Sequence, residues 1–209
     1  MCKRLIIVGA GDLGKEVFGW MQLSGFLSHF SGLYFIDDNI SSLKYSGYEL
    51  TYLGNIDGFY PMVGDELIAT IASPISRSKV VEKLLSHGCI FSSYIDPSVM
   101  LSSSSRVGQG CIILPYSLIS NDTVIGNFSI INCHSSIGHN VSIGSFVSIS
   151  AHVDIMGHCE VGDNVFMGSG SRVLPTKRIG EFSTIGAGAT ASRSVPPGKT
   201  LYAPLSKLL

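Results

Sequence analysis

The sequence is poor in charge and has no long apolar run. Only 14% of its 209 residues are charged and the formal net charge is −1, so the chain lacks the basic surface that binds nucleic acid or anionic membranes. No run of about 18 apolar residues is present that could span a bilayer. These absences argue against a nucleic-acid-binding protein and against membrane insertion.

Export signals and disulfide patterns are missing as well. The apolar run at 5–8 ends at glycines and Asp12, which is far too short for the core of a signal peptide. The five cysteines are odd in number and scattered, with no CxxC pair. This usage fits reduced thiols better than a disulfide framework or a zinc site. We therefore expect a cytoplasmic protein.

A six-residue period runs through the second half of the chain. Stepping by six from Ile95 to Ile185 meets an aliphatic residue or methionine at all sixteen positions. Because about half of the residues in ordinary proteins are apolar, chance would give this about once in 10⁵ trials. Neither a helix nor an array of hairpins keeps a strict period of six. The period predicts a parallel β-solenoid whose aliphatic side chains stack into one interior column per face.

A second period of 18 residues is superimposed on the first. Five of the aliphatic positions are 18 apart and are each followed by glycine: Val107, Ile125, Ile143, Val161 and Ile179. Three six-residue units per 18 residues describe a triangular coil, in which each unit gives one short strand and one corner. Two residues before the aliphatic position the side chain is often small, as at Ser117 and Ser135, and Lys177 departs from this pattern.

The first 90 residues have a different character. A buried-strand pattern at 4–8 runs into a GxGxxG motif formed by Gly9, Gly11 and Gly14. At a strand-to-helix turn such a motif lets backbone N–H groups and a helix N-terminus hold phosphate. A tight turn with no ligand is the simpler interpretation of the glycines alone.

Two further strands are expected in this segment, at 33–36 and at 66–72, the second leading into a helix. The first ends in Asp37 and Asp38, placed like the acidic residue that binds a ribose hydroxyl. The segment is too short for both halves of a dinucleotide fold. It predicts a small α/β, Rossmann-like module that holds one nucleotide rather than NAD.

Together these features resemble the NeuD/PglD-like hexapeptide-repeat acetyltransferases, a group of nucleotide-aminosugar N-acetyltransferases and sialic-acid O-acetyltransferases. The resemblance spans nearly the whole chain and is carried by GAGDLGKEV, FIDD, YIDPSVMLSSSSRVGQGCIILP, INCHSSIGHNVSIGSFVSIS and VFMGSGSRVLP. It implies a Rossmann-like sugar-nucleotide-binding domain at 1–90, a left-handed parallel β-helix at 91–190 and a capping tail at 191–209. It also implies a homotrimer with acetyl-CoA in a groove between two solenoids.

The resemblance also implies a catalytic set. His139 stands in the family frame N-x-x-S-x-I-x-H with Asn132, Ser135 and Ile137. It inherits the role of general base, which imidazole suits near neutral pH. Asn132 belongs to the same set. Gly157, one coil above His139, is expected to donate its N–H to the thioester oxygen.

The binding residues follow from the same resemblance. Acetyl-CoA is expected along Ser148, Gly168, Ser169 and Ala187. Its phosphates are expected near Lys177, Arg178, Arg193 and Lys199. The sugar nucleotide is expected at Gly9, Gly11, Asp12, Leu13, Gly14, Asp37, Asp38, Ala72 and Ser73.

The sequence departs from the family pattern at two places. Many members flank the catalytic histidine with a carboxylate that orients it, but the neighbours here are Gly138 and Asn140. Asn121 or Asp122, one coil below, is the expected substitute. Leu13 stands where many members have a histidine that meets the sugar nucleotide, so contacts there must differ.

A zinc site is the competing interpretation of the histidines. His134 and His139 also resemble the pair in γ-class carbonic anhydrases, but Ser98 and Ser103 occupy the positions two coils earlier where a third histidine is needed. Zinc requires at least three protein ligands, so no metal is expected. His152 follows His134 by one coil and is placed to stack on it.

The other histidines and one cysteine are assigned less specifically. For His134, His152 and His158 a structural role and a substrate-lining role both stay open. Cys133 is near His139 in the sequence, which suggests a thiol nucleophile, but a small residue filling a corner is the preferred interpretation.

The sequence thus predicts an acetyl-CoA-dependent N-acetyltransferase acting on a nucleotide-linked amino-sugar of the 4-amino-4,6-dideoxyhexose type. The expected setting is the biosynthesis of a bacterial surface polysaccharide such as an O-antigen. Two alternatives stay open. One is an O-acetyltransferase of sialic acid, in which His139 activates a hydroxyl. The other is a non-catalytic trimeric solenoid whose first domain binds nucleotide as a regulatory ligand.

Overall fold

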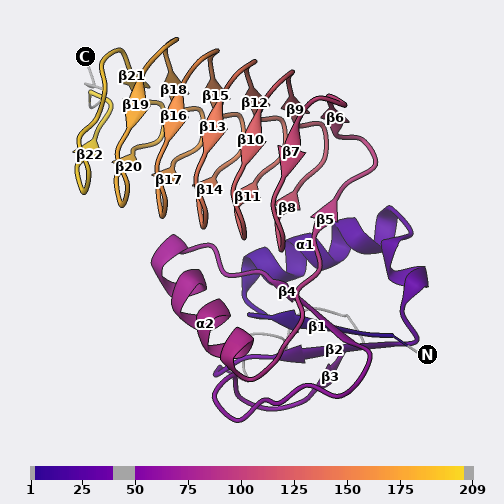
Figure 1. The fold of residues 1–209 in the computed structure, drawn as a ribbon. Helices are drawn as coiled ribbons and strands as arrows, with labels where there is room; N and C mark the ends of the chain where they lie inside the picture. The colour runs from indigo at the N-terminus through magenta and orange to yellow at the C-terminus, as the bar shows by residue number, and fades with distance from the viewer. Residues whose placement is uncertain (1–2, 40–49, 205–209) are drawn as a thin grey trace, which may run out of the picture. The chain divides into compact units, whose positions relative to one another are not determined.

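The computed structural model describes residues 3–39 and 50–204. Contacts divide the chain into two compact units, Met1–Asp96 and Pro97–Leu209. The first unit combines helices with a small sheet, and the second is a succession of very short strands (Figure 1).

The first unit is built on a parallel four-stranded sheet in the order β3-β2-β1-β4. Its strands are β1 (Arg4–Val8), β2 (Gly32–Ile36), β3 (Thr51–Tyr52) and β4 (Asp65–Ala69). Helix α1 (Asp12–Leu23) follows β1, the 3₁₀ helix η1 (Phe26–His29) precedes β2, and α2 (Pro74–Ser86) follows β4. The apolar side chains of β1 are buried, as expected for a central parallel strand covered on both faces.

The predicted elements of this unit are confirmed with small changes of boundary. Strands at 4–8 and 33–36 are present, and the third expected strand, 66–72, is observed as Asp65–Ala69. It ends three residues early because β1 stops at Val8. Thr70 makes the last ladder bond, to the Val8 carbonyl, and its hydroxyl then turns to the Gly9 carbonyl.

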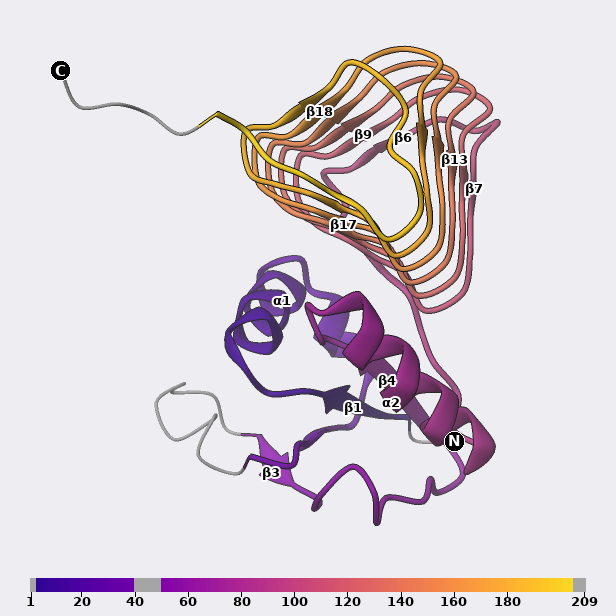
Figure 2. The same ribbon diagram turned by 90° about the vertical axis from the view of Figure 1, so that its left-hand side faces the viewer.

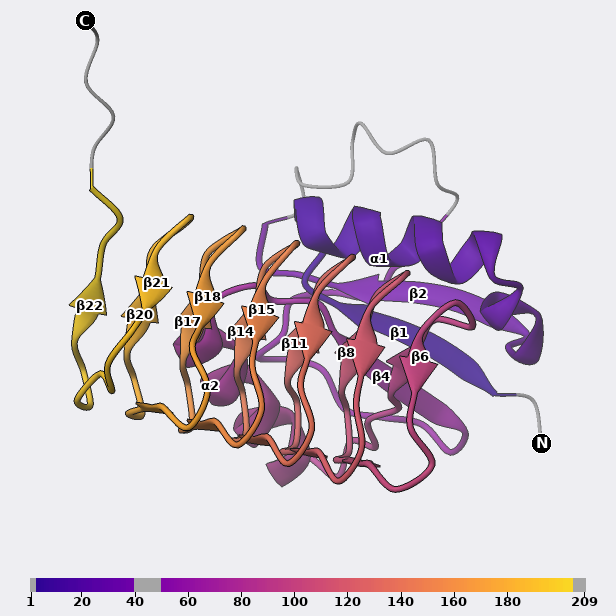
Figure 3. The same ribbon diagram turned by 90° about the horizontal axis from the view of Figure 1, so that it is seen from above.

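A parallel β-solenoid with three faces begins at β5 (Tyr94–Ile95), the last strand of the first unit, and makes up the second unit, which confirms the predicted fold class. The seven-stranded face has the order β22-β20-β17-β14-β11-β8-β5, the six-stranded face β21-β18-β15-β12-β9-β6, and the five-stranded face β19-β16-β13-β10-β7. Viewed along its axis the solenoid is a stack of triangular coils (Figure 2). Seen from above, the labelled strands of the seven-stranded face, from β8 to β22, lie in coil order (Figure 3).

All strands of the solenoid are two residues long. The seven-stranded face contains β5 (Tyr94–Ile95), β8 (Ile112–Ile113), β11 (Ile130–Ile131), β14 (Ser148–Ile149), β17 (Phe166–Met167), β20 (Thr184–Ile185) and β22 (Thr200–Leu201). The six-stranded face contains β6 (Met100–Leu101), β9 (Leu118–Ile119), β12 (Ser136–Ile137), β15 (Asp154–Ile155), β18 (Arg172–Val173) and β21 (Thr190–Ala191). The five-stranded face contains β7 (Arg106–Val107), β10 (Val124–Ile125), β13 (Ser142–Ile143), β16 (Glu160–Val161) and β19 (Arg178–Ile179).

The second residue of each strand is the periodic aliphatic one, and from Ile113 to Ile185 all of these side chains are buried. The small residues two positions earlier are also inside, where their hydroxyls bond to carbonyls of the next turn. Ser117 donates to the Asn132 carbonyl and Ser135 to the Ser150 carbonyl. These bonds explain why a small polar residue is compatible with the interior, since a buried hydroxyl needs a partner.

Each coil turns at three corners, and from Gly110 to Gly188 every corner places one residue in the left-handed region of backbone space. Corner A follows the seven-stranded face, with Tyr116, His134, His152, Gly170 and Gly188 at positive φ. Corner B follows the six-stranded face, with Asp122, Asn140, His158 and Thr176. Corner C follows the five-stranded face, with Gly110, Phe128, Phe146, Asn164, Phe182 and Gly198. These corners decide which side chains the solenoid brings together.

Candidate active site

His139 lies at corner B, immediately after β12, and its side chain is exposed. Its Nδ1 is 3.0 Å from Oδ1 of Asn140. An amide oxygen only accepts hydrogen bonds, so this contact places the imidazole proton on Nδ1 and leaves Nε2 with a free lone pair. The arrangement is suited to a base that takes a proton at Nε2.

The partner of His139 is therefore Asn140 and not one of the residues expected one coil below. The Asn121 side-chain oxygen accepts a hydrogen bond from the Ser102 hydroxyl at 2.5 Å, and the Asn121 carbonyl accepts the Asn140 N–H. The left-handed backbone of Asn140, at φ 56°, turns its side chain back along the corner. Asparagine tolerates this conformation better than most residues.

Gly157 lies against the ring of His139. A Cβ at Gly157 would be 2.8 Å from both Cε1 and Nε2 of His139, closer than real side chains pack. The absence of a side chain at Gly157 thus makes room for the imidazole edge that carries the free lone pair. The ring of His158 approaches the His139 ring edge-on, with centroids 5.0 Å apart and planes at 87°.

Asn132 is not brought to His139 within one chain. It lies at corner A, after β11, and β12 separates it from corner B. Its side-chain oxygen accepts the N–H of Cys133 at 2.7 Å, and its carbonyl accepts the Ser117 hydroxyl. Cys133 is at corner A too, so its nearness to His139 exists in the sequence only.

The residues expected to bind acetyl-CoA line up along corner A and the seven-stranded face. Ser148 belongs to β14 and is buried. Gly168 and Ser169 form the corner two coils after Asn132, and Ala187 follows one coil later. A Cβ at Gly168 would meet the Ala187 nitrogen at 2.5 Å. Within one chain the six-stranded face therefore separates this row, at corner A, from His139, at corner B.

The thiols in the solenoid that the structure describes offer no activated nucleophile beside His139. Cys159, at corner B, is fully buried and its sulfur contacts the Leu174 carbonyl at 3.1 Å. Burial raises the pKa of the Cys159 thiol, and in the first unit burial raises the pKa of Cys89 to about 11. Thiols in this state stay protonated near neutral pH and are poor nucleophiles.

The glycine motif of the first unit has the geometry of a phosphate-binding turn. Gly9 has φ +90° and forms the turn after β1, and a Cβ at Gly14 would meet the Gly9 carbonyl oxygen at 2.3 Å. A Cβ at Gly11 would meet nothing within 4 Å. In motifs of this kind one glycine forms the tight turn, one leaves the backbone open to the ligand, and one allows close packing of the helix.

The two aspartates after β2 hold loops in place. One Asp37 oxygen accepts the Ala10 N–H at 2.6 Å and the other accepts the Asn39 N–H at 2.7 Å. An oxygen of Asp38 accepts the Ile56 N–H at 3.0 Å. Asp37 thus supports the glycine loop, in addition to any contact with a ligand.

The remaining residues expected to meet the sugar nucleotide lie at the starts of the two helices. Asp12 begins α1 with a fully exposed side chain, followed by the half-buried Leu13. Ser73 caps α2, its hydroxyl accepting the Ser76 N–H. The Ala72 carbonyl is 3.4 Å from a guanidinium nitrogen of Arg77, which is completely buried.

The predicted stack of His134 on His152 is present at corner A. The two imidazoles are 5.1 Å apart with planes at 3°, and Tyr116 extends the stack on the other side of His134. Among residues 3–39 and 50–204 no group of three His, Cys, Asp or Glu side chains is arranged to hold a metal ion. No helix in the same ranges is long and apolar enough to cross a membrane.

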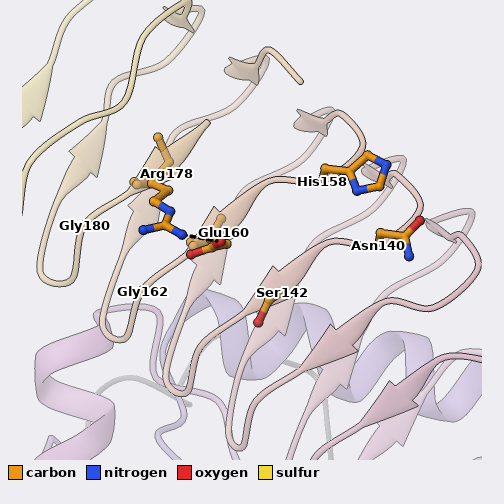
Figure 4. A pocket seen from close by; sticks show the side chains of 9 residues that line it. Asn140, Ser142, His158, Glu160, Gly162, Arg178 and Gly180 are labelled. Atoms are coloured by element: carbon orange, nitrogen blue, oxygen red, sulfur yellow. Dashed lines mark hydrogen bonds and ion pairs between the residues drawn. The ribbon is translucent and has the colours of Figure 1, made fainter. Parts of the chain in front are cut away.

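A hollow of about 740 Å³ opens on the outer side of the five-stranded face, beside corner B. Its lining includes Asn140, Ser142, His158, Glu160 and Arg178 (Figure 4). Neither Ser142 nor Glu160 was predicted from the sequence as a site residue, and Arg178 was expected near the CoA phosphates. The spacing of 18 between these three residues, in a chain with few charges, was the available signal.

No family model and no curated protein sequence matches the chain, but solved structures match it over almost its full length. The acetyltransferase domain of PglB from Neisseria gonorrhoeae superposes with a TM-score of 0.85 at 22% identity, covering 95% of both chains. PerB from Caulobacter crescentus, solved with CoA and GDP-perosamine, gives 0.81 at 24% identity over 96% of this chain and 94% of that one. WeeI from Acinetobacter baumannii gives 0.82 at 25% identity and covers 95% of both chains.

The chain has the fold of the NeuD/PglD-like hexapeptide-repeat acetyltransferases. Both units are included in these superpositions, so the resemblance seen in the sequence extends to the order in which α/β module and solenoid follow each other. At these identities the likeness concerns the fold.

Proposed function

We propose that the protein is an acetyl-CoA-dependent N-acetyltransferase acting on the amino group of a nucleotide-linked amino-sugar. The observation that carries this proposal is the pairing of His139 Nδ1 with the Asn140 amide oxygen at 3.0 Å. It supplies an oriented base at an exposed corner of a fold shared with acetyltransferases. Solved structures of that fold include complexes with acetyl-CoA and with CoA plus GDP-perosamine.

The reaction needs a proton acceptor from the protein but no protein nucleophile. The amine lone pair attacks the thioester carbonyl carbon, and the carbon–sulfur bond breaks to release the CoA thiolate. Nε2 of His139 takes the amine proton and, as imidazolium, returns it to the thiolate. Because the amine is itself the nucleophile and the Cys159 thiol at corner B is buried, attack is direct and no acyl-enzyme forms.

The Gly157 N–H is the proposed donor to the carbonyl oxygen in this step. Gly157 already lies against the Nε2 edge of His139, so the proposed donor and the proposed base are adjacent at corner B. A donor fixed in advance where negative charge develops stabilises the transition state.

The glycine turn of the first unit is the proposed site for the nucleotide. Open backbone at Gly11, the turn at Gly9 and the start of α1 suit a diphosphate. Asp37, which accepts the Ala10 N–H of this turn, is proposed to complete the site together with Asp38, Ala72 and Ser73, and with Asp12, Leu13 and Gly14 on α1. Leu13 offers no polar group, so the sugar end must be recognised elsewhere.

The proposed oligomer is a homotrimer in which one chain supplies the base and the next chain supplies the acetyl-CoA row. Within one chain His139 is at corner B, whereas Ser169 and Ala187 are at corner A. A second solenoid placing its corner A against corner B would bring base and thioester together. Closed rings of identical subunits commonly form sites in this way.

The test is release of free thiol from acetyl-CoA against a panel of UDP-, dTDP- and GDP-linked 4-amino-sugars, with free and CMP-linked sialic acid alongside. We expect turnover with at least one amino-sugar nucleotide and none with sialic acid. His139→Ala should abolish most of it, whereas His29→Ala, an exposed histidine of the first unit, should not. Turnover with sialic acid alone would replace the proposal with O-acetylation.

A further inference from the structure

The hollow beside corner B exists because of one small residue in an outward-facing column. On the five-stranded face the first residues of successive strands stand in register, so that Val124, Ser142, Glu160 and Arg178 follow one another along the axis. Ser142 is the smallest of them and interrupts the ridge. Gly162 and Gly180, on the next two coils, also line the hollow.

The hollow carries charges of both signs. Arg178 donates to the Glu160 carboxylate at 2.9 Å (Figure 4), and their side chains are 74% and 55% exposed. An ion pair this exposed contributes little to stability. Two charged residues facing one another in a chain with only 14% charged residues therefore call for an explanation other than folding.

The hollow also adjoins the proposed base. Two of its lining residues contact the His139 ring: Asn140 through its amide oxygen and His158 through its ring edge. A molecule seated among Ser142, His158 and Glu160 lies next to the corner where His139 takes a proton.

We infer that this hollow receives the sugar ring of the acceptor, with the Glu160 carboxylate accepting hydrogen bonds from its hydroxyl groups. Arg178 holds that carboxylate in position. The inference rests on the proposed function and extends it, because it assigns sugar recognition to the solenoid rather than to the glycine turn. It also gives Arg178 a role at the sugar in place of one at the CoA phosphates.

Charge favours the sugar over acetyl-CoA as the occupant. A carboxylate repels the phosphates of CoA and has nothing to donate to the pantetheine carbonyls. The same carboxylate suits a sugar, whose hydroxyls and amine are donors.

The test separates the two substrates by their KM values. In Glu160→Gln and in Ser142→Leu, which fills the hollow, we expect the KM for the amino-sugar nucleotide to rise about 10- to 100-fold, the usual effect of losing a hydrogen bond to a charged group. The KM for acetyl-CoA should stay within about twofold. The matched controls are Glu181→Gln, an exposed acid at corner C, and Val124→Leu, on the same face but outside the hollow.

The outcomes are distinguishable from failure of the proposed function. If the wild-type protein neither turns over nor binds any amino-sugar nucleotide by calorimetry, the proposed function falls and this inference falls with it. If the wild-type protein is active but both hollow variants keep the acceptor KM, only the inference is overturned. A rise confined to the KM for acetyl-CoA overturns it as well. Melting temperatures equal to wild type show that the variants remain folded.

Discussion

The neutral side-chain amide of Asn140 contacts Nδ1 of His139 and orients the ring. The amide oxygen fixes the tautomer in the same way as a carboxylate, since both accept the Nδ1 proton. Unlike a carboxylate, it adds no negative charge to stabilise the imidazolium. The proposed proton transfer at this corner therefore relies on geometry more than on electrostatic assistance.

Replacing Asn140 by aspartate restores the charge and tests the pairing. A carboxylate about 3 Å from the ring favours imidazolium, so the acidic limb of the pH–rate profile should move to higher pH by about one unit. Asn140→Ala should lower kcat without that displacement. An unchanged acidic limb in Asn140→Asp would show that the two side chains do not interact in solution.

His139→Ala removes the base altogether. If the fold is intact, we expect kcat to fall by about 10²–10⁴, the usual contribution of a positioned base. The measurement is steady-state thiol release, with circular dichroism to confirm the solenoid. A loss smaller than about tenfold would remove His139 from the mechanism.

Gly157→Ala tests the packing between neighbouring coils. The added methyl lies 2.8 Å from Cε1 and Nε2 and must push the ring out of place, because φ at Gly157 is not in the left-handed region and the backbone itself can accept alanine. A misplaced catalytic group costs roughly 10²-fold in rate. The measurements are kcat and the melting temperature of the variant and of the wild type. A lower melting temperature with unchanged kcat would contradict the proposed contact.

At the scale of elements, the register of β1 with β4 brings Arg4 opposite Asp65. The guanidinium makes two bonds to the carboxylate, at 2.6 and 2.7 Å, and Asp65 is buried. Burial by itself raises the pKa of Asp65. The bonds from Arg4 and from the Met62 N–H outweigh this effect and leave the pKa below its ordinary value of 3.8.

A carboxyl group whose pKa is lowered in the folded state stabilises the protein above its unfolded pKa. This stabilisation is lost as the pH falls below 3.8 through the folded value. Asp65→Asn leaves Arg4 without its buried counter-charge and should lower the free energy of unfolding by about 3 kcal/mol at neutral pH. The difference between variant and wild type should shrink in acid. A difference that persists undiminished at low pH would assign the loss to packing instead.

The elements themselves were predictable because each follows from a local rule. A strict period of six permits one architecture, and the 18-residue spacing of glycines sets the triangular coil. The same arithmetic puts Asn132 and His139, seven residues apart, on different corners, and it placed His152 over His134 correctly. The solenoid could be derived from the sequence because every coil repeats the same interactions.

What could not be predicted depends on single side chains. The sequence shows that no carboxylate flanks His139. It does not show that the side-chain amide of Asn140 reaches the His139 ring. The hollow was missed because it is defined by a small residue between larger ones on an outward face. Outward positions carry no hydrophobic period, so only the 18-residue spacing of Ser142, Glu160 and Arg178 could have indicated it.

At the scale of the whole molecule, the separation of His139 from the acetyl-CoA row predicts sites shared between subunits. Sedimentation should give three times the mass of the chain. Co-expression of His139→Ala with Ser169→Trp, a bulky residue at an exposed corner A position, should restore about a quarter of the activity from two inactive variants, because about one site in four combines two unaltered partners.

Restoration depends on where the two halves of a site come from. If corner A and corner B of one chain formed the site, every site in the mixture would carry one of the two changes. Activity would then stay at the level of the single variants. This outcome would contradict the shared site while leaving the fold unaffected.

The proposed function depends above all on the acceptor being an amine of a nucleotide-linked sugar. The decisive comparison is thiol release from acetyl-CoA with two acceptors that differ in one group, a nucleotide-linked 4-amino-sugar and the same molecule with a hydroxyl in place of the amine. We expect turnover with the amine alone and a product acetylated on nitrogen. Equal rates with both acceptors, or acetyl found on oxygen, would contradict the proposed function.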